Sequence, residues 1–296
     1  MEQVRLDRFL ANSGCGTRTD VKKLIKSGCV LVGSRPETDP GRKICPGEDM
    51  VTVSGRQISA SGMRYYMLNK AAGTISATRD AAQKTVLDLL PERRDDLFPV
   101  GRLDLDTEGL LLITNDGALA HRLTAPAWHV NKTYEAVVTG TITQAAVDAF
   151  REGLDIGDER RTLSAKLSEI TDEAHCRELY ASMQRICDAN RSRADILQDA
   201  DGVLPEKREG PEDPEGAVSC VQVTVREGRF HQIKRMFEAV GEKVLYLRRV
   251  QMGPLILDTG LAVGESRMLT EQEIQALRRC VERKNSDKIR SKELEG

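Results

Sequence analysis

Two aspartates stand on a short charged stretch directly before an apolar segment near the middle of the chain. Gly101-Arg102-Leu103-Asp104-Leu105-Asp106 leads toward the apolar run 110–113, which the turn residues 115–117 follow. An apolar run of this length between turn signals predicts a buried strand. The carboxylates then lie on a loop at the edge of a rigid sheet. A side chain there is accessible and also held in place, as catalysis requires.

The whole stretch 101–117 resembles the signature of the pseudouridine synthases, specifically their RsuA-type branch. In that family the aspartate after Gly-Arg-Leu is the catalytic carboxylate, and the matching residue here is Asp104. The resemblance implies an isomerase that converts uridine in RNA to pseudouridine and needs neither a cofactor nor a metal ion. It also implies Arg102 as a contact to the substrate.

Two more segments resemble motifs of the same family. Asn69-Lys70-Ala71-Ala72-Gly73 looks like its first motif, with Ala71 where the family usually has proline. Lys70 is then either a contact to a substrate phosphate or simply a lysine at a strand end. In the alternating segment 132–138, which predicts a strand, Tyr134 matches the tyrosine that packs against the target base in the family.

The segment 226–237 resembles the third motif, in which a turn after the strand 221–225 leads into a helix near His231. By this resemblance Ile233 is the apolar floor of the site and Lys234 is the base that pairs with the catalytic aspartate. Arg229 contacts RNA phosphate or the loop around Asp104. His231 is an alternative general base, although a histidine at a helix start is more often structural.

The first 60 residues form a candidate module of their own. Thr17 and Asp20 have the spacing of a capping box before a predicted helix that stops at Gly28, and the strand 30–32 follows. Basic residues four apart line one face of this helix, namely Arg18, Lys22 and Lys26. Such a stripe is usually a solvated face. However, the module resembles the S4 RNA-binding domain, which implies that these bases contact RNA phosphates.

Charge is distributed unevenly along the chain. The formal net charge is only −2, but the segment 195–217 has eight acidic and two basic residues, a net charge of −6. Residues 1–36 and 226–249 each hold seven basic and three acidic residues, a net charge of +4. The two basic islands are consistent with a nucleic-acid partner, which the net charge alone would argue against. The acidic, Pro- and Gly-containing segment 185–217 predicts an exposed loop insert.

Length and composition fit about two domains of a globular protein. The chain has 296 residues, of which 40% are hydrophobic and 30% charged. Apolar runs stay well below the roughly 18 residues of a membrane span, and the start lacks the apolar region of a secretion signal. Seven scattered cysteines without a Cys-x-x-Cys pair indicate reduced thiols. These features predict a cytoplasmic protein without a membrane partner, and we expect it to be a monomer.

Together these interpretations give an α+β protein. A small S4 RNA-binding domain over residues 1–60 is followed, after a linker at 54–62, by a catalytic domain over 63–283 and a charged, frayed tail over 284–296. By resemblance the catalytic domain has a bent, mainly antiparallel mixed sheet with flanking helices, two of them near 143–152 and 270–283. The resemblance implies ribosomal RNA as the partner, and the residues at 231–234 and 247–255 resemble the small-subunit branch of the family.

Three alternatives stay open from the sequence. The first is a large-subunit rRNA synthase of the same family. The second is a non-catalytic S4-type RNA-binding protein, in which Asp104, Tyr134 and Lys234 need not occur together. The third is a phosphatase of the haloacid-dehalogenase type, because Asp104-Leu105-Asp106-Thr107 also matches Asp-x-Asp-x-Thr. That loop should follow an apolar parallel strand, whereas here the apolar run comes after it.

Overall fold

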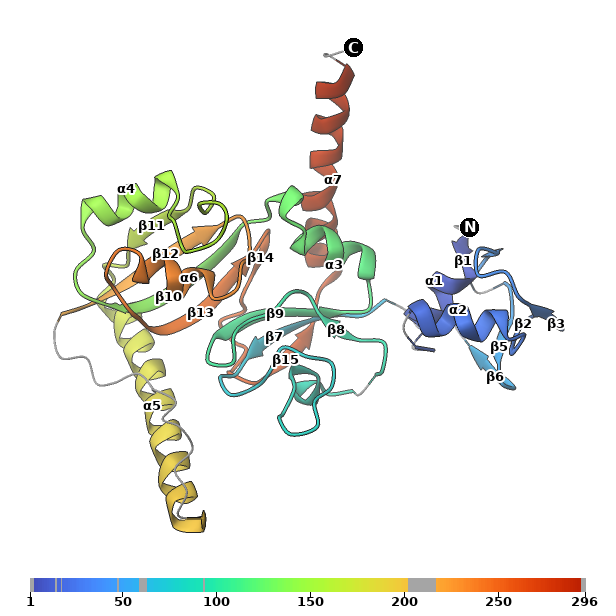
Figure 1. Cartoon of the computed structure of the whole chain (residues 1–296), viewed down its shortest axis with the longest axis horizontal. Helices are drawn as coiled ribbons and strands as arrows, with labels where there is room; N and C mark the ends of the chain where they lie inside the picture. The colour runs from blue at the N-terminus through green and yellow to red at the C-terminus, as the bar shows by residue number, and fades with distance from the viewer. Residues whose placement is uncertain are drawn as a thin grey trace.

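A computed structural model describes residues 3–13, 15–16, 18–46, 48–58, 63–92, 94–201 and 217–293. Figure 1 shows a small N-terminal unit beside a larger unit that is built around one sheet. Within the described residues, no helix combines the length and the apolar character that crossing a membrane needs.

The N-terminal unit packs two helices against short strands. Its elements are β1 (Val4–Arg5), α1 (Leu6–Asn12), α2 (Arg18–Lys26), β2 (Val30–Val32), β3 (Arg35–Glu37), β4 (Lys43–Ile44), β5 (Val51–Val53) and β6 (Arg56–Ile58). β1 pairs with β4, and the other four strands form a sheet in the order β3-β2-β5-β6. Val21 and Ile25 of α2 are fully buried in the shared core. Gly28 follows α2 with φ +75°, which confirms it as the helix stop; Thr17 of the predicted capping box lies outside the described residues.

The predicted linker at 54–62 is wrong over its first half. Ser54 and Gly55 have positive φ values of 50° and 82° and form the two-residue turn of a hairpin between β5 and β6. Two successive positive φ values match the twist of hairpin strands. The small, polar residues that predicted a flexible linker are therefore turn residues, and 59–62 lie outside the described residues.

The larger unit contains a nine-stranded, mainly antiparallel mixed sheet, as expected. Its strands are β7 (Tyr65–Lys70), β8 (Phe98–Pro99), β9 (Glu108–Thr114), β10 (Lys132–Thr139), β11 (Lys166–Glu169), β12 (Val218–Val225), β13 (Val244–Met252), β14 (Leu255–Ile256) and β15 (Ser266–Met268). The order is β11-β12-β10-β13-β9-β7-β15, with β14 paired to β13 and β8 to β9. β13 and β9 form the parallel pair, so the sheet joins two antiparallel halves at this point.

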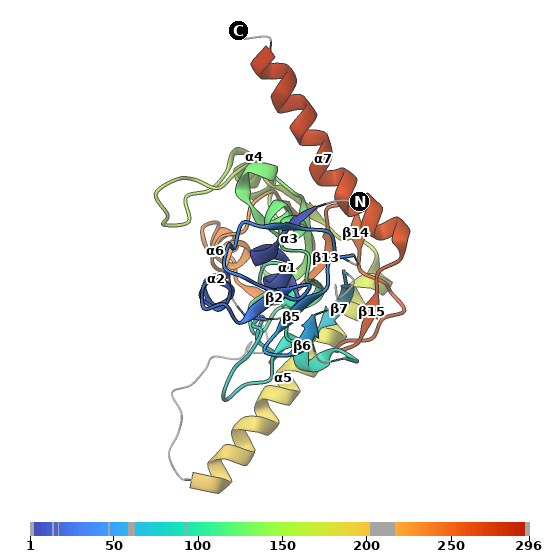
Figure 2. The ribbon, with the colours of Figure 1, turned by 90° about the vertical axis from the view of Figure 1, so that its right-hand side faces the viewer.

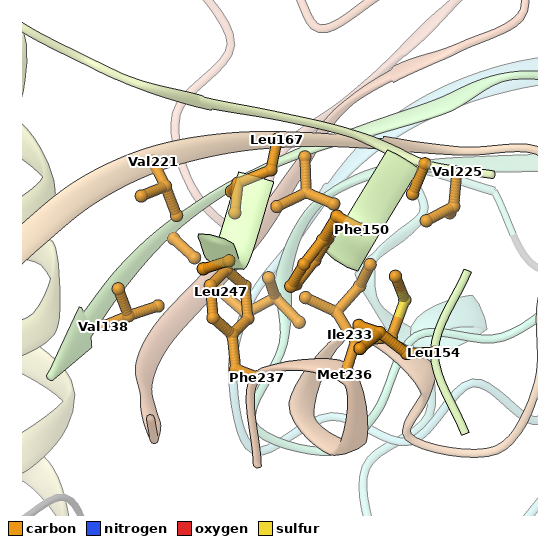
Figure 3. Packing of buried hydrophobic residues seen from close by; sticks show 14 of the residues in the cluster. Val138, Phe150, Leu154, Leu167, Val221, Val225, Ile233, Met236, Phe237 and Leu247 are labelled. Carbon is orange, nitrogen blue, oxygen red and sulfur yellow. The ribbon is translucent and has the colours of Figure 1, made fainter. Parts of the chain in front are cut away.

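Helices cover both halves of the sheet. They are the 3-10 turns η1 (Val86–Leu89) and η2 (Pro126–Trp128) and the helices α3 (Gly117–Thr124), α4 (Gln144–Glu152), α5 (Glu173–Asp201), α6 (Gln232–Glu238) and α7 (Glu271–Glu293). Figure 3 shows how α4 and α6 pack on one half, where the Phe150 and Phe237 rings lie 5.0 Å apart. The predicted helices near 143–152 and 270–283 are present. α7 continues to Glu293, through most of the segment expected as a frayed tail.

Two predicted connections are helical instead. Asp116 does not simply close a turn: it caps α3 by accepting a hydrogen bond from the backbone N–H of Leu119 at 3.0 Å. α5 covers 185–201 of the predicted loop insert, and residues 202–216 lie outside the described residues. Leu179, Met183 and Cys187 recur every four residues along α5 and are buried against the sheet. Burial of this apolar stripe stabilises a helix where the acidic composition had predicted a loop. Figure 2 shows α5 and α7 projecting from the body in opposite directions.

Candidate active site

The loop of Asp104 lies between β8 and β9 and is tied to the segment that follows β7. The backbone N–H of Gly73 donates to the carbonyl oxygen of Leu105 at 2.8 Å. Ser76 Oγ bonds both the carbonyl oxygen of Leu103, at 2.8 Å, and its N–H, at 3.0 Å. These bonds fix the backbone on either side of Asp104, whose side chain stays 28% exposed. The first two motifs along the chain therefore form one rigid site, with a reachable carboxylate.

Lys70 lies beneath this loop. Its Nζ donates to the carbonyl oxygens of Asp104 at 3.0 Å, Leu105 at 3.2 Å and Thr107 at 2.8 Å, and also to that of Ala71 at 3.1 Å. Lys70 is 0% exposed, so the structure favours the second of its two expected roles, a lysine at a strand end, over a contact to a substrate phosphate. The lysine at the end of β7 instead holds the loop of Asp104. Burial lowers the pKa of Lys70 to about 8, although carboxylates nearby oppose that shift.

A cationic side faces Asp104 from the start of α6. Lys234 Nζ lies 3.8 Å from Asp104 Oδ2, and His231 Nε2 lies 3.7 Å from Asp104 Oδ1. Lys234 is closer to Asp106, with both carboxylate oxygens at 2.7 Å. The structure thus brings Lys234 to Asp104 as predicted, but it shares the lysine between two carboxylates. Positive charge at this distance offsets the cost of an ionised carboxylate in a partly buried position.

Comparisons with known proteins agree with this arrangement of motifs. The family profile of RNA pseudouridylate synthase matches residues 64–239, and that of the S4 domain matches residues 4–50. The chain belongs to the RNA pseudouridylate synthase family. With its S4 region it falls in the RsuA/RluB branch, and it is an isomerase.

Relatives match along almost the whole chain. The RNA pseudouridine synthase YtzG of Bacillus subtilis is 37% identical and covers 93% of this chain and 98% of its own length. The ribosomal small subunit pseudouridine synthase A of Vibrio parahaemolyticus is 33% identical over 93% and 99% of the two chains. The ribosomal large subunit pseudouridine synthase B of Bacillus subtilis is 32% identical over 93% and 95%.

A solved structure supports the same fold. A crystal structure of a pseudouridylate synthase, 30% identical, covers 93% of this chain and 99% of its own with a TM-score of 0.56. Family membership excludes the phosphatase and the non-catalytic alternatives. The geometry agrees for the phosphatase, because the strand before Asp104 is the two-residue antiparallel β8 rather than a long parallel strand.

Tyr134 of this synthase lies on β10, between β12 and β13 in one half of the sheet. Its partly buried side chain packs against the core cluster of α4 and α6 and against a second cluster that contains Leu103, the neighbour of Asp104. Arg102, on the other side of Leu103, is exposed. Both predicted residues therefore lie beside the loop that holds the candidate catalytic carboxylate.

Two predicted substrate contacts have structural roles here. Arg229 donates to the carbonyl oxygens of Arg160 at 2.6 Å and Arg161 at 2.8 Å, and it pairs with Asp158 at 3.3 Å and Glu227 at 3.1 Å. These bonds tie the 158–161 loop to the turn before α6.

Ile233 is the other structural residue. It is 4% exposed and packs among the apolar side chains of the cluster drawn in Figure 3. It supports α6 from inside the core, so it does not form an open floor for a substrate. The helix it anchors is nevertheless the one that carries His231 and Lys234 toward Asp104.

A buried network beneath the loop was not predicted. Glu108, at the start of β9, is 2% exposed and accepts hydrogen bonds from Tyr246 Oη at 3.0 Å and Arg185 Nη2 at 2.9 Å. Its other oxygen accepts from the N–H of Ala72 at 3.3 Å. Burial and the neighbouring carboxylate raise the pKa of Tyr246. This network joins β9 to β13 and α5. The sequence showed an acidic residue after Thr107 but not these distant partners.

Proposed function

We propose that this synthase converts a specific uridine of ribosomal RNA to pseudouridine, with Asp104 as the catalytic carboxylate and small-subunit RNA as the substrate. The observation that carries the proposal is a partly exposed Asp104 carboxylate with Lys234 beside it at 3.8 Å, on a loop whose backbone Lys70 holds from below. The names of the relatives support ribosomal RNA as the substrate. However, this chain is almost equally identical to a small-subunit enzyme (33%) and to a large-subunit enzyme (32%). The choice of small-subunit RNA rests on the resemblance of the sequence at residues 231–234 and 247–255 to the small-subunit branch.

The reaction breaks the bond between N1 of uracil and C1′ of the ribose, turns the base and joins C5 to C1′. Asp104 assists either by adding covalently to the sugar or base or by promoting a glycal-type intermediate. Lys70 holds the loop so that the carboxylate stays fixed while the base turns. Lys234 places its ammonium group 3.8 Å from the carboxylate.

Tyr134 is proposed to stack on the target base and to accept a proton late in the cycle. The uridine has to leave its helical stack to reach Asp104, so the enzyme binds it as a flipped-out nucleotide. The S4 domain, proposed as residues 1–60, adds phosphate contacts through the exposed side chains of Arg18, Lys22 and Lys26. The catalytic domain is proposed as residues 63–283.

Pseudouridine mapping of rRNA by carbodiimide-dependent primer stops tests the proposal. A strain that lacks the protein is complemented with either wild type or Asp104→Asn. We expect one stop in small-subunit RNA to be lost in the deletion strain and restored by wild type alone. A stop that is lost in large-subunit RNA would reassign the substrate.

Two other results would contradict the proposal more deeply. Unchanged stops in every strain would remove ribosomal RNA as the substrate. A stop restored equally by Asp104→Asn would make Asp104 structural. Because Asp104 is partly exposed and is replaced by a residue of similar shape, loss of folding is not expected to explain a loss of activity.

A further inference from the structure

An exposed aromatic pair borders the catalytic carboxylate. Phe230 is 76% exposed, more than any other large hydrophobic residue in the described part of the chain. One face of its ring stacks on His231, with ring centroids 3.8 Å apart and an angle of 17° between the ring planes. The free face of the Phe230 ring is therefore available to a ligand that could remove its apolar surface from water.

The backbone holds this pair in place. His231 has a left-handed conformation, φ 49° and ψ 33°, which a non-glycine residue adopts only where its surroundings impose it. Arg235 fixes the turn by donating to the carbonyl oxygen of Phe230 at 3.1 Å and to Asp158 at 2.6 Å. The aromatic pair is therefore presented outward by a braced turn.

Its position relates the pair directly to the chemistry. The inner ring, His231, places Nε2 3.7 Å from Asp104 Oδ1, while the outer ring is Phe230. Lys234 lies on the same turn of α6 and Arg102 is exposed on the loop of Asp104. A flat aromatic surface with cations beside it has the composition of sites that bind single-stranded nucleic acid.

We propose that Phe230 and His231 form a stacking platform for the unpaired nucleobase next to the target uridine in the RNA. When the uridine turns out of its stack, its neighbour loses a stacking partner. The outer face of Phe230 replaces that partner, and His231 supports Phe230 from behind. Stacking is available to every base, so the platform contributes affinity and position at this nucleotide rather than sequence choice. This inference rests on the proposed function.

The first test measures stacking without turnover. A short single-stranded oligouridylate with one 2-aminopurine next to a central uridine is titrated with the full-length protein, and the 2-aminopurine fluorescence is followed. We expect quenching by wild type and by Phe230→Tyr, which keeps an aromatic face. Phe230→Ala should quench little. Ile256→Ala, which truncates another exposed side chain at 65% exposure, is the matched control and should behave as wild type.

The second test measures turnover on the RNA fragment that contains the mapped uridine. Phe230→Ala should raise KM about tenfold and leave kcat within about twofold, because stacking on the neighbour contributes binding rather than chemistry. Phe230→Tyr should restore KM. Replacing the neighbouring base with an abasic nucleotide should make wild type and Phe230→Ala equal.

Several outcomes would overturn the platform. These are the absence of quenching by wild type, equal quenching by wild type and Phe230→Ala, and a KM penalty that persists on the abasic RNA. A penalty seen only on assembled ribosomal particles and not on naked RNA would assign Phe230 to a protein partner. Wild-type protein that quenches through Phe230 but modifies no ribosomal RNA would leave the platform standing and refute the proposed substrate.

Discussion

The Lys70 ammonium is fully buried under the loop of Asp104, where it donates hydrogen bonds to three backbone carbonyl oxygens of that loop. Lys70→Met removes all these donors and leaves the carbonyl oxygens without this partner. A displacement of a catalytic group by about 1 Å costs about 100-fold in rate. We therefore expect Lys70→Met to lower kcat about 100-fold, measured as pseudouridine formed per unit time. Activity within a fewfold of wild type would show that other bonds suffice to hold the loop.

The same lysine gives the stability a defined pH dependence. Its pKa is about 8 in the folded protein and about 10.5 when unperturbed, so the unfolded chain binds more protons between these values. The contribution of Lys70 to the free energy of unfolding therefore rises with pH across this window, by up to about 1.4 kcal/mol per pH unit. Urea unfolding of wild type and Lys70→Met near pH 8 and near pH 10 measures it. The free energy of unfolding of wild type, relative to that of Lys70→Met, should be higher near pH 10 than near pH 8. A difference that does not change with pH would contradict the lowered pKa.

Asp106 competes with Asp104 for Lys234, and a pair of substitutions separates the two carboxylates. Lys234→Met removes the cation beside Asp104 and should lower kcat about 100-fold or more. Asp106 is 63% exposed, and an exposed ion pair contributes at most about 1 kcal/mol, so Asp106→Asn should cost no more than about fivefold. The measurement is kcat of each variant on the mapped RNA fragment. If Asp106→Asn is as damaging as Asp104→Asn, the catalytic role belongs to both carboxylates or to Asp106.

At the scale of elements, α5 is held to the sheet by one apolar stripe. Leu179 is 0% exposed in the cluster that also contains Met183 and Cys187. Leu179→Ala should destabilise the protein by about 2–5 kcal/mol, because it removes buried methyl groups and leaves a cavity. Arg177→Ala, on the exposed side of the same helix, is the control and should change stability by less than about 0.5 kcal/mol. Equal urea midpoints for the two variants would mean that the stripe does not anchor α5.

Local sequence patterns predicted individual strands and helices. The strand that became β9 was predicted from the apolar run 110–113 between turn signals, and a helix was expected near 143–152, where α4 lies. Long-range pairing was not foreseen. Gly109 illustrates why: a Cβ there would lie 2.3 Å from the carbonyl oxygen of Arg249, so the glycine is required by a strand that comes 140 positions later in the chain. The burial of Lys70 and the network around Glu108 depend on the same distant contacts.

In the molecule as a whole, the basic stripe proposed to bind RNA and the proposed catalytic carboxylate lie in different units. The proposed catalytic carboxylate lies in the larger unit, whereas the exposed stripe of Arg18, Lys22 and Lys26 lies on α2 of the N-terminal unit. The small net charge of −2 conceals this stripe because the acidic segment 195–217 balances it. Phosphate contacts release counterions, so each one adds about 0.7–0.9 to the slope of log affinity against log salt concentration.

Replacing all three bases of the stripe with glutamine should therefore weaken RNA binding and lower that slope by about 2–3. The measurement is the affinity for the mapped RNA fragment at several salt concentrations. Lys166→Gln, which removes an exposed lysine from β11, is the single-charge control and should leave the slope within about 0.5 of wild type. An unchanged slope in the triple variant would make the stripe a solvated face. RNA would then be held by the larger unit alone, where Arg102 is exposed on the loop of Asp104 and Lys234 lies 3.8 Å from its carboxylate.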